Sequence, residues 1–383
     1  MYSTNSRDEL GAIRKDASSP GDKRVIKELR EAGLKTARER LIGLLDEGSL
    51  VEIDAFVKHR SGDHGMHVHT PLGDGVVAGH GKIDGRRVVS FSQDFSVFAG
   101  TMGEMHAKKI TKVVEFAEKA SLPIVGIWDG DGQRAHEGVT SLGSTGELLD
   151  ALVSCSGKVP LISIVLGTVS GTSALAAGIS DFVILGNKRG RMFMRSPYSI
   201  PEIIDGEIDE ETLGGAVQHA SRSGIACMVS NSEEEAFDMV AEILAYLPDH
   251  TMSEAPVIST GDRWDRKCKG IRKLVPEDSD SPYDIREVFN HVFDEGRFLE
   301  LFSSYAENIV IGFARLDGYS VGVIGNQPSV LAGCLDIDAS VKAARFIRTC
   351  DCFNIPLVTF VDVPGFLPGT VQEWGGIIRH GAK

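Results

Sequence analysis

The chain of 383 residues lacks long apolar runs, and none approaches the roughly 18 to 20 residues that a helix needs to cross a bilayer. The opening stretch MYSTNSRDELGAIRKD is charged and has no apolar core, so it differs from a secretory signal. These two absences predict a cytoplasmic protein with no membrane contact.

Basic residues are in deficit. Lys and Arg together number 40 against 54 Asp and Glu, which leaves a formal net charge of −14. Proteins hold nucleic acids mainly through Lys and Arg on the phosphates, so this charge argues against a nucleic-acid partner. A local basic patch could still bind a small phosphorylated ligand.

Metal-ligand patterns are missing as well. The six cysteines are scattered, and only Cys350 and Cys352 are close together, without the paired CxxC spacing of a zinc ribbon. We therefore expect buried thiols. The segment HRSGDHGMHVHT contains His59, His64, His67 and His69, but the spacing fits no ligand pattern. We expect a surface loop there and no metal site.

What the chain does have is a length suited to two domains. It exceeds what one hydrophobic core usually supports, and 42% hydrophobic with 25% charged residues is typical of a globular protein. Residues 249–284 are rich in turn formers and charge, and we interpret them as a linker. The expected domains are residues 1–255 and 256–383.

Two stretches of the chain, residues 81–132 and 314–365, repeat each other in a gapless register of 233 residues. The matches fall on Asp-Gly pairs at 84 and 317, Ala-Gly pairs at 99 and 332, prolines at 123 and 356, and aspartates at 129 and 362. Because turn residues have specific backbone demands, we interpret this as an internal duplication. The weaker match of LLDEGSLVEID with VFDEGRFLELF suggests that both copies begin with the same helix and strand.

Each copy has the pattern of an α/β crossover unit. The Asp-Gly pair closes a hairpin, a helix over about 103–119 follows, and the apolar strand IVGIW is buried on both faces. The apolar face of this helix is expected to hold Met105, Ile110, Val113, Val114 and Ala117, and its polar face Lys108, Lys109, Lys112 and Glu115.

The first copy continues beyond this unit. A second helix is expected with Ser144 or Thr145 as its N-cap, then the buried strand VPLISIVLG, then the turn TVSG opening a helix of small residues. The equivalent of Gly171 in the second copy would fall beyond Lys383, so the second copy is expected to be incomplete. Residues 233–235, all glutamates, are expected to be a solvated helix start.

The strand-to-helix junctions at 129–134 and 167–173 each contain glycines. Peptide N–H groups at a helix start have no intrahelical acceptor, and two such turns on neighbouring strands could direct two donors at one oxygen. Such an oxyanion hole stabilises an enolate by about 3 to 4 kcal/mol per donor. The alternative is that the glycines only allow a helix to pack closely on a strand.

Several motifs resemble the carboxyltransferase (β) subunit of biotin-dependent acyl-CoA carboxylases, of the propionyl-CoA carboxylase β type. They are TARERLIGLLDEGSLVEI, GDGVVAGHGKIDGR, NQPSVLAGCLDIDAS, DVPGFLPG and GGIIRHGAK. The resemblance spans nearly the whole chain and implies an α/β crotonase-like (ClpP/crotonase) fold. This fold is a ββα superhelix, here in two tandem copies of which the second is incomplete.

The resemblance implies transfer of CO2 from carboxybiotin, carried on a partner protein, to the α carbon of a short-chain acyl-CoA such as propionyl-CoA or acetyl-CoA. It implies a biotin carboxylase or biotin carboxyl carrier subunit as partner, and a homo-oligomer, either a dimer or a trimer of dimers. In the family the N-terminal domain binds acyl-CoA and the C-terminal domain binds biotin. Backbone N–H groups stabilise both enolates, and no metal is needed.

Carried onto this chain, the resemblance assigns two groups of site residues. The acyl-CoA oxyanion hole would use Gly132, Gln133, Gly171 and Thr172, and the biotin side would use Val363, Pro364, Gly365 and Phe366. The family pattern has no acid at the position of Asp131 and a glycine at the position of Thr172. The glycine turn of the second hole lies in a segment that this chain lacks.

Three hypotheses follow from the resemblance. The chain is the carboxyltransferase of an acyl-CoA carboxylase, or the subunit of a biotin-dependent decarboxylase that moves CO2 in the opposite direction. The third hypothesis is a non-catalytic homologue that binds CoA or supports assembly, suggested by Asp131, Thr172 and the missing turn.

Overall fold

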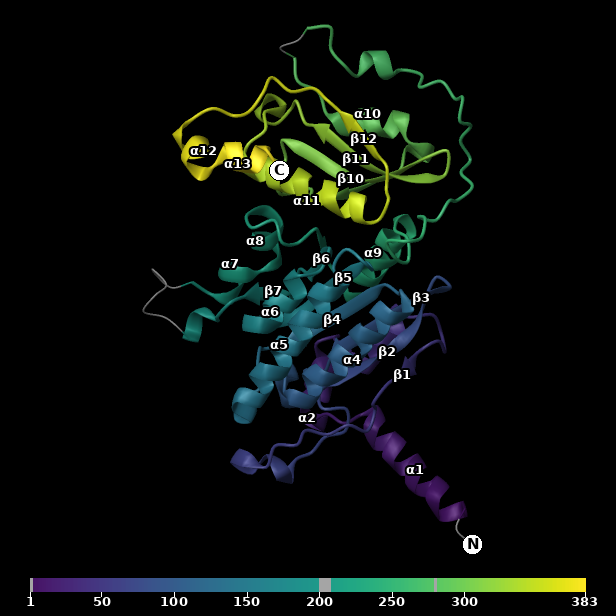
Figure 1. Cartoon of the computed structure of the whole chain (residues 1–383), viewed down its shortest axis with the longest axis vertical. Helices are drawn as coiled ribbons and strands as arrows, with labels where there is room; N and C mark the ends of the chain where they lie inside the picture. The colour runs from purple at the N-terminus through teal and green to yellow at the C-terminus, as the bar shows by residue number, and fades with distance from the viewer. Residues whose placement is uncertain (1–2, 200–207, 279–280) are drawn as a thin grey trace. The chain divides into compact units, whose positions relative to one another are not determined.

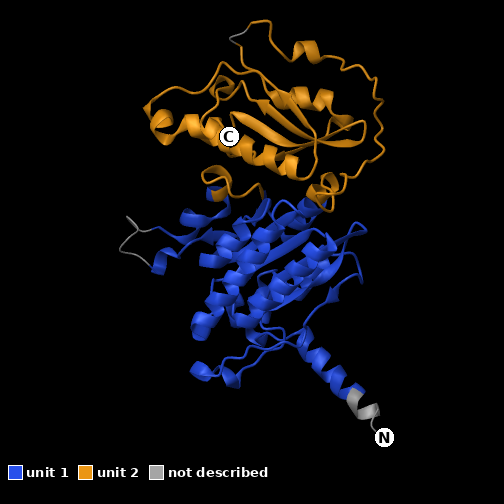
Figure 2. Cartoon of the chain, in the orientation of Figure 1, with its two compact units in different colours: residues 1–218, 229–241 blue, residues 219–228, 242–383 orange. Residues whose placement is uncertain are grey.

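The computed structural model describes residues 3–199, 208–278 and 281–383 (Figure 1). The chain forms two compact units (Figure 2). Unit 1 comprises Met1–Gln218 and Val229–Ala241, and unit 2 comprises His219–Met228 and Glu242–Lys383. None of the helices among the described residues is both long and apolar enough to span a membrane.

The first sheet has eight strands in the order β1-β2-β3-β4-β5-β6-β8, and β7 pairs with β5. The hairpin β2–β3 is antiparallel, whereas β3, β4, β5 and β6 run parallel to one another, as expected of successive crossover units. The strands are β1 (Val51–Glu52), β2 (Val76–Ile83), β3 (Arg86–Gln93), β4 (Ile124–Gly130), β5 (Leu161–Ser170), β6 (Phe182–Gly186), β7 (Arg191–Phe193) and β8 (Met228–Ser230).

The second sheet has four strands in the order β12-β11-β10-β9, with β11 and β12 parallel and the other pairs antiparallel. These strands correspond to β1 to β4, and the described residues after β12 form no further strand. The prediction of two copies with an incomplete second one is therefore confirmed. The strands are β9 (Phe298–Leu301), β10 (Ile309–Leu316), β11 (Tyr319–Asn326) and β12 (Leu357–Phe360).

Helices separate the strands. Over the described residues the α-helices are α1 (Ser3–Ser18), α2 (Lys23–Glu31), α3 (Ala37–Leu44), α4 (Glu104–Ala120), α5 (Gly138–Cys155), α6 (Gly171–Gly178), α7 (Glu210–Gly214), α8 (Ala216–Ser221), α9 (Glu233–Tyr246), α10 (Ile285–Val292), α11 (Ile337–Cys352), α12 (Thr370–Gly375) and α13 (Ile377–Gly381). The short 3₁₀ helices are η1 (Asp63–Val68), η2 (Phe98–Gly100), η3 (Ala135–Glu137), η4 (Pro197–Ser199), η5 (Ile271–Lys273), η6 (Asp294–Gly296) and η7 (Leu331–Gly333).

The duplication extends to individual backbone angles. The starts of β2, β3, α4 and β4 all recur 233 residues later as the starts of β10, β11, α11 and β12. The hairpin turn has left-handed φ at Asp84 (49°) and again at Asp317 (51°), each followed by a glycine with positive φ. Two consecutive positive φ values define the type I′ turn that suits a twisted hairpin. The prediction of an Asp-Gly hairpin in each copy is confirmed.

The predicted apolar face of the 103–119 helix packs inward, except that Met105 is only half-buried. Ile110, Val113, Val114 and Ala117 of α4 are fully buried, and every residue of β4 is buried. In unit 2, side chains from α10 form the centre of a core against β10 and β11. Its buried members are Ile285, Val288, Phe289, Phe293, Val310, Ala314, Val321 and Val323.

Lys109 is the exception on this helix, because the prediction that it lies on the polar face is wrong. Its side chain is buried, and Nζ donates to the Val76 carbonyl at 2.7 Å. The equivalent lysine of the second copy, Lys342, is also buried and donates to the equivalent carbonyl of Ile309 at 2.8 Å. Burial lowers the pKa of each lysine to about 8. A buried lysine thus ties the helix to the hairpin in both copies.

Two further predictions about polar residues are wrong. Ser144 and Thr145 do not cap α5, which begins at Gly138; both lie buried inside it. The hydroxyl of Thr145 donates to the Ser141 carbonyl one turn earlier, so its polarity is satisfied within the helix. Of the three glutamates that open α9, Glu234 is exposed as expected, but Glu233 is buried in an ion pair rather than solvated.

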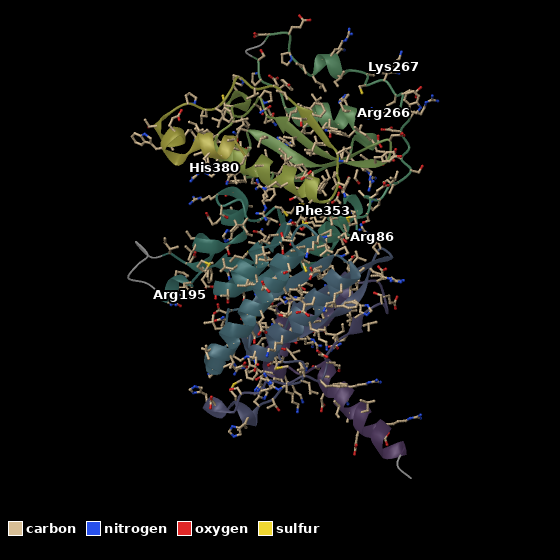
Figure 3. The ribbon with its side chains drawn as sticks, in the orientation of Figure 1. Arg86, Arg195, Arg266, Lys267, Phe353 and His380 are labelled. Atoms are coloured by element: carbon tan, nitrogen blue, oxygen red, sulfur yellow. The ribbon has the colours of Figure 1, made fainter. Side chains whose placement is uncertain are left out.

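The predicted linker is largely irregular, and η5 is its only helix over the described residues of 249–284. This segment belongs to unit 2, and its Arg266, labelled in Figure 3, donates to the carbonyls of His291, Val292 and Phe293 at 2.7 to 2.9 Å. These carbonyls end α10, where helix geometry leaves acceptors without partners.

Candidate functional site

The two glycine junctions of the first copy lie side by side. Strands β4 and β5 are parallel neighbours, and Gly130 at the end of β4 is in register with Val169. A Cβ atom on Gly132 would lie 2.9 Å from the Ser170 hydroxyl, and Gly132 has a φ of 71°. Both the close approach and the backbone angle therefore require glycine there.

The second junction opens a helix. Ser170 is extended, and α6 begins at Gly171 with a left-handed φ of 57°. The N–H groups of Gly171 and Thr172 thus lie in the first turn, where no intrahelical acceptor exists. The predicted residues of the acyl-CoA oxyanion hole are brought together around the ends of β4 and β5.

Gly132 does not offer its N–H to a ligand, because this group donates to the Gly130 carbonyl at 2.9 Å. The neighbouring bonds link the turn to Met102, whose N–H donates to Gly132 and whose carbonyl accepts from Arg134, at 2.8 and 2.9 Å. Gln133 lies between them in a parallel bridge with Met102. Since peptide groups alternate in direction along an extended chain, the Gln133 N–H points away from Met102.

Five buried polar side-chain atoms at these junctions have no hydrogen-bond partner among the described residues. Asp129 Oδ1 and Arg134 Nε belong to side chains that are ion-paired through their other atoms, and the remaining three are Gln133 Nε2, Thr172 Oγ1 and Ser173 Oγ. Buried polar groups are rarely left unpaired, so such a cluster indicates a place where a ligand supplies the partners. Sequence reasoning considered only main-chain donors here and missed Ser173; its position one residue after Thr172, in the first turn of α6, was the available signal.

Asp131, the acid that departs from the family pattern, is exposed to solvent. A carboxylate in water repels a developing anion much less than a buried one, because the high dielectric constant screens its charge. Thr172, the second departure, is half-buried, and its hydroxyl is one of the unpaired groups.

A buried ion-pair cluster contacts the first junction through the side chain of Asp129. Arg40 Nη1 contacts Asp129 Oδ2 at 2.7 Å, and Arg40 Nη2 contacts Glu233 Oε1 at 2.8 Å. Burial lowers the pKa of Arg40, but the charges and hydrogen bonds of the two carboxylates outweigh this and raise it overall. Gly167 makes room, since a Cβ there would lie 1.7 Å from Asp129 Oδ1.

A second buried arginine fixes the far end of the same turn. Arg134 Nη1 contacts Asp74 at 2.6 Å and Glu137 at 2.8 Å, and its guanidinium lies over the Phe98 ring at 4.6 Å. Both arginines are almost completely shielded from solvent. The turn between Asp129 and Arg134 is therefore held by charge pairs at each end.

The predicted biotin-side turn lies in unit 2 and repeats the same backbone pattern. Leu335 donates its N–H to Gly365 at 3.1 Å and accepts from Leu367 at 2.8 Å, so Phe366 occupies the position of Gln133. Tyr283 donates to Asp362 at 2.8 Å. Burial, together with the Asp362 carboxylate, raises the pKa of Tyr283 to about 12, so the phenol is a neutral donor at neutral pH.

A cavity of about 710 Å³ adjoins this turn in unit 2. Val363 and Pro364 line it, whereas Gly365 and Phe366 do not. Phe366 borders a second, more apolar cavity of about 400 Å³ together with α13. Residues of this turn therefore line two different cavities.

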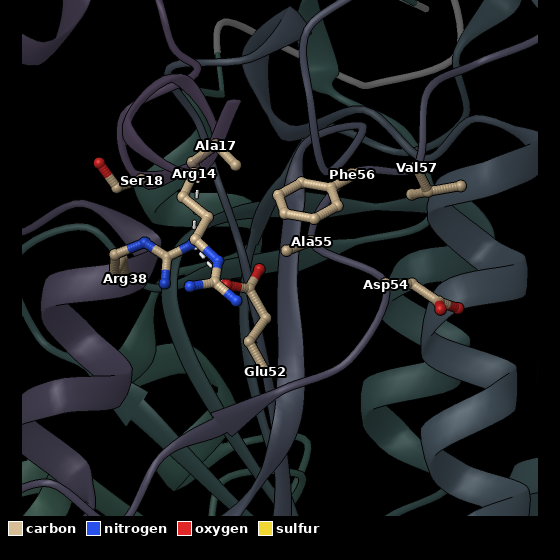
Figure 4. A pocket seen from close by; sticks show the side chains of 9 residues that line it. All are labelled: Arg14, Ala17, Ser18, Arg38, Glu52, Asp54, Ala55, Phe56 and Val57. Carbon is tan, nitrogen blue, oxygen red and sulfur yellow. Dashed lines mark hydrogen bonds and ion pairs between the residues drawn. The ribbon is translucent and has the colours of Figure 1, made fainter. Parts of the chain in front are cut away.

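A further cavity of about 810 Å³ lies in unit 1 beside α1 (Figure 4). The guanidinium groups of Arg14 and Arg38 lie near the Glu52 carboxylate in this view, and Arg38 contacts Glu52 at 2.6 Å. Asp54 at the rim pairs with Lys112. Because much of its charge is paired internally, we place the candidate site at the glycine junctions, where the unpaired donors are.

The remaining predictions concern cysteines and histidines. Cys155, Cys227 and Cys350 are buried as expected, but the other three cysteines are partly exposed, so the prediction is wrong for them. In the histidine-rich segment His64, His67 and His69 are exposed, in keeping with the expected surface loop, whereas His59 is buried against Phe98. Over the described residues, no three His, Cys, Asp or Glu side chains are grouped to hold a metal ion.

Comparison with known proteins gives matches over most of the chain. A family model described as carboxyl transferase domain matches residues 28–383. The methylmalonyl-CoA decarboxylase subunit alpha of Veillonella parvula is 46% identical over 97% of this chain and 73% of its own. The propionyl-CoA carboxylase beta chain of Saccharopolyspora erythraea is 46% identical over 96% of this chain and 69% of its own.

A solved structure agrees with these relatives. The transcarboxylase 12S hexamer core, with hydrolysed methylmalonyl-coenzyme A bound, superposes with a TM-score of 0.96 at 40% identity. The match covers 100% of this chain and 74% of that one. The fold expected from the sequence is confirmed, and the chain belongs to the carboxyl transferase family.

Proposed function

We propose that this chain is the carboxyltransferase component of a biotin-dependent acyl-CoA carboxylase. It moves CO2 from carboxybiotin to the α carbon of a short-chain acyl-CoA such as propionyl-CoA or acetyl-CoA. The relatives at 44 to 46% identity include acetyl-/propionyl-CoA carboxylase beta5 subunits and propionyl-CoA carboxylase beta chains, which supports this substrate class.

The observation that carries the proposal is the group of unpaired donors at the ends of β4 and β5. Gln133 Nε2 and the hydroxyls of Thr172 and Ser173 are buried without partners in the described part of the chain. A thioester enolate has an oxygen that needs such donors, and a preorganised donor contributes about 3 to 4 kcal/mol.

The proposed roles follow from the backbone. The N–H groups of Gln133, Gly171 and Thr172, together with the Thr172 hydroxyl, would bind the enolate oxygen, while Gly132 shapes the turn and leaves space for Ser170. This modifies the expectation from the sequence, in which Gly132 was itself a donor. The buried arginines hold the turn in place, so little reorganisation accompanies the reaction.

The biotin side is proposed for Val363, Pro364, Gly365 and Phe366. The cavity beside Val363 and Pro364 has room for a bicyclic ring, and the Phe366 N–H points away from Leu335 as that of Gln133 points away from Met102. When bound, carboxybiotin supplies CO2 and then a urea anion that accepts the α proton of the acyl-CoA. The chain's part is to orient that ring and to donate a hydrogen bond to its oxygen.

The second candidate is the decarboxylase subunit that moves CO2 from an acyl-CoA to biotin. It is favoured by methylmalonyl-CoA decarboxylase alpha subunits of Veillonella parvula and Propionigenium modestum, at 46% and 43% identity. Both directions use the same two enolates, so the same residues serve either reaction.

The remaining assignments are proposals about context. A biotin carboxylase or carrier subunit would deliver the biotin, and a homo-oligomer would form, because the matched transcarboxylase core is a hexamer. We place the acyl-CoA domain at residues 1–255, the biotin domain at 256–383, and the protein in the cytoplasm.

Turnover of methylmalonyl-CoA with added biotin tests the proposal. Thr172→Val removes one unpaired hydroxyl with little change in shape and is expected to lower kcat by about 10²-fold. Ser230→Ala is the matched control, because it removes another buried, unpaired hydroxyl far along the chain. Wild-type protein that binds acyl-CoA but shows no turnover would favour the non-catalytic alternative.

A further inference from the structure

In both copies the last residue of the hairpin carries a side-chain amide. These residues, Gln93 in β3 and Asn326 in β11, are 233 positions apart and are buried. Gln93 Oε1 accepts a hydrogen bond from the Asp129 N–H at 3.1 Å, and Asn326 Oδ1 accepts one from the Asp362 N–H at 3.3 Å. Each aspartate is the residue with which the reactive turn begins.

The other end of each amide is anchored, which leaves the oxygen directed at the turn. Asn326 Nδ2 donates to the Gly333 carbonyl at 3.1 Å. Gln93 Nε2 lies 3.3 Å from His106 Nε2, and His106 Nδ1 lies 3.0 Å from the Asp74 carbonyl. Burial lowers the pKa of His106 well below its usual value. The neutral ring therefore donates from Nδ1 and accepts at Nε2.

The carbonyl side of each aspartate is also confined. A Cβ on Gly100 would lie 2.1 Å from the Asp129 carbonyl oxygen, and one on Gly333 would lie 2.7 Å from that of Asp362. Both glycines have left-handed φ, 67° and 74°. The N–H of each aspartate is thus bound by a side-chain amide, and its carbonyl oxygen packs closely against a glycine.

We propose that Gln93 and Asn326 are a duplicated pair of positioning residues, each setting one of the two reactive turns. Gln93 positions the turn that ends in Gln133, and Asn326 positions the turn that ends in Phe366. The inference rests on the proposed function, in which the first turn serves the acyl-CoA and the second serves biotin. In this proposal each amide acts through the aspartate N–H that it binds and not by contact with substrate.

Each amide can position its reactive turn because the aspartate that it binds is close in sequence to the residue that donates the N–H. Only three residues separate Asp129 from Gln133, and likewise Asp362 from Phe366. A displaced aspartate peptide therefore displaces the donor N–H, and a misplacement of about 1 Å costs about 10²-fold in rate. The two turns lie in different sheets, so each amide acts on its own half of the reaction.

The test uses the full chain with Gln93→Met and Asn326→Leu, which keep side-chain size and remove the acceptor. Hydrogen exchange followed by mass spectrometry reports on residues 129–134 and 362–367. Gln93→Met is expected to speed exchange about tenfold in the first segment only, which corresponds to about 1.4 kcal/mol. Asn326→Leu is expected to do so in the second segment only.

Kinetics give the second readout. With methylmalonyl-CoA and free biotin as substrates, Gln93→Met is expected to lower kcat/KM for the acyl-CoA about tenfold and leave KM for biotin unchanged. Asn326→Leu is expected to raise KM for biotin and leave acyl-CoA binding, measured by calorimetry, unchanged. Ser90→Ala in β3 and Ser320→Ala in β11 are matched controls, since each removes a buried, unpaired hydroxyl from the same strand.

The outcomes separate the two levels of the argument. If wild-type protein neither binds acyl-CoA nor turns it over, the proposed function fails, while the exchange data still decide whether the amides hold the turns. If the wild type is active and each variant affects both segments and both substrates alike, the positioning inference is overturned. Equal changes in the serine controls would overturn it as well.

Discussion

Replacing Arg40 with methionine tests the claim that a buried charge cluster supports the first reactive turn. The side chain contacts Asp129 through Nη1 at 2.7 Å and Glu233 through Nε and Nη2 at 3.0 and 2.8 Å. All three side chains are buried. Methionine fills much of the space but leaves two carboxylates facing each other without a cation.

The magnitude follows from what is left behind. Breaking a buried ion pair by removing one partner costs about 3 to 5 kcal/mol, because the remaining charge is desolvated and unpaired. Here two carboxylates lose their partner, and Asp129 Oδ1 already lacks a hydrogen-bond donor among the described residues. We therefore expect the free energy of unfolding to fall by at least about 3 kcal/mol.

Urea unfolding monitored by tryptophan fluorescence provides the assay. Trp128 is buried beside Asp129, whereas Trp264 and Trp374 are more than 80% exposed, so replacing both with phenylalanine leaves one reporter close to the cluster. Arg24→Met is the control, because Arg24 forms only an exposed i,i+4 pair with Glu28 and is expected to cost less than about 0.5 kcal/mol.

A neutralised cluster distinguishes charge from packing. Adding Asp129→Asn and Glu233→Gln to Arg40→Met removes the unpaired charges and is expected to recover about 2 kcal/mol. The reasoning is refuted if Arg40→Met costs less than about 1 kcal/mol, or if the triple variant is no more stable than the single one.

The remaining predictions concern the other devices of the fold. Gly171→Ala places a side chain at a φ of 57° and is expected to lower the free energy of unfolding by about 1 to 2 kcal/mol and to lower kcat/KM for acyl-CoA. Gly143→Ala, in an open position of α5, is expected to stabilise the protein instead. Unfolding curves and initial rates check both variants. Lys342 has a folded-state pKa of about 8 against 10.5 when unfolded, so between these pH values the unfolded chain binds more protons and folding becomes more favourable as pH rises. Urea unfolding at pH 7 and pH 10 should show wild type gaining up to about 3 kcal/mol over Lys342→Met, and no gain would contradict the burial argument. Tyr283→Phe removes the bond to Asp362 and is expected to raise KM for biotin several-fold at unchanged KM for acyl-CoA; equal changes in both would argue against a local effect.

The repeat shows which features were predictable without coordinates. The Asp-Gly hairpins, the α4 and α11 helices and the strands β4 and β12 all form where the pattern predicts them. These features depend on a few adjacent residues: an Asp-Gly pair suits a type I′ turn, and apolar side chains three or four apart make one helix face. The carbonyl–glycine contacts that confine Asp129 and Asp362 follow from the same duplication.

Predictions failed where a polar residue is buried by a distant partner. Lys109 was assigned to a solvent face, but its ammonium group donates a hydrogen bond to the Val76 carbonyl and forms an ion pair with Glu52. Glu233 was expected to be solvated, but it pairs with Arg40, 193 residues earlier. Neither partner is visible in a local pattern, because the cost of burying a charge depends on which groups the fold brings within about 3 Å.

The sequence by itself determined that one crossover unit occurs twice, with glycine turns at equivalent places, and which family these turns belong to. Only the tertiary structure decided which groups at the turns are available. It paired the Gly132 N–H within the turn and left Gln133 Nε2 and the Thr172 and Ser173 hydroxyls without partners among the described residues. The physical reason is that turn conformation is a property of neighbouring residues, whereas hydrogen-bond satisfaction is decided by every group that folding brings into contact.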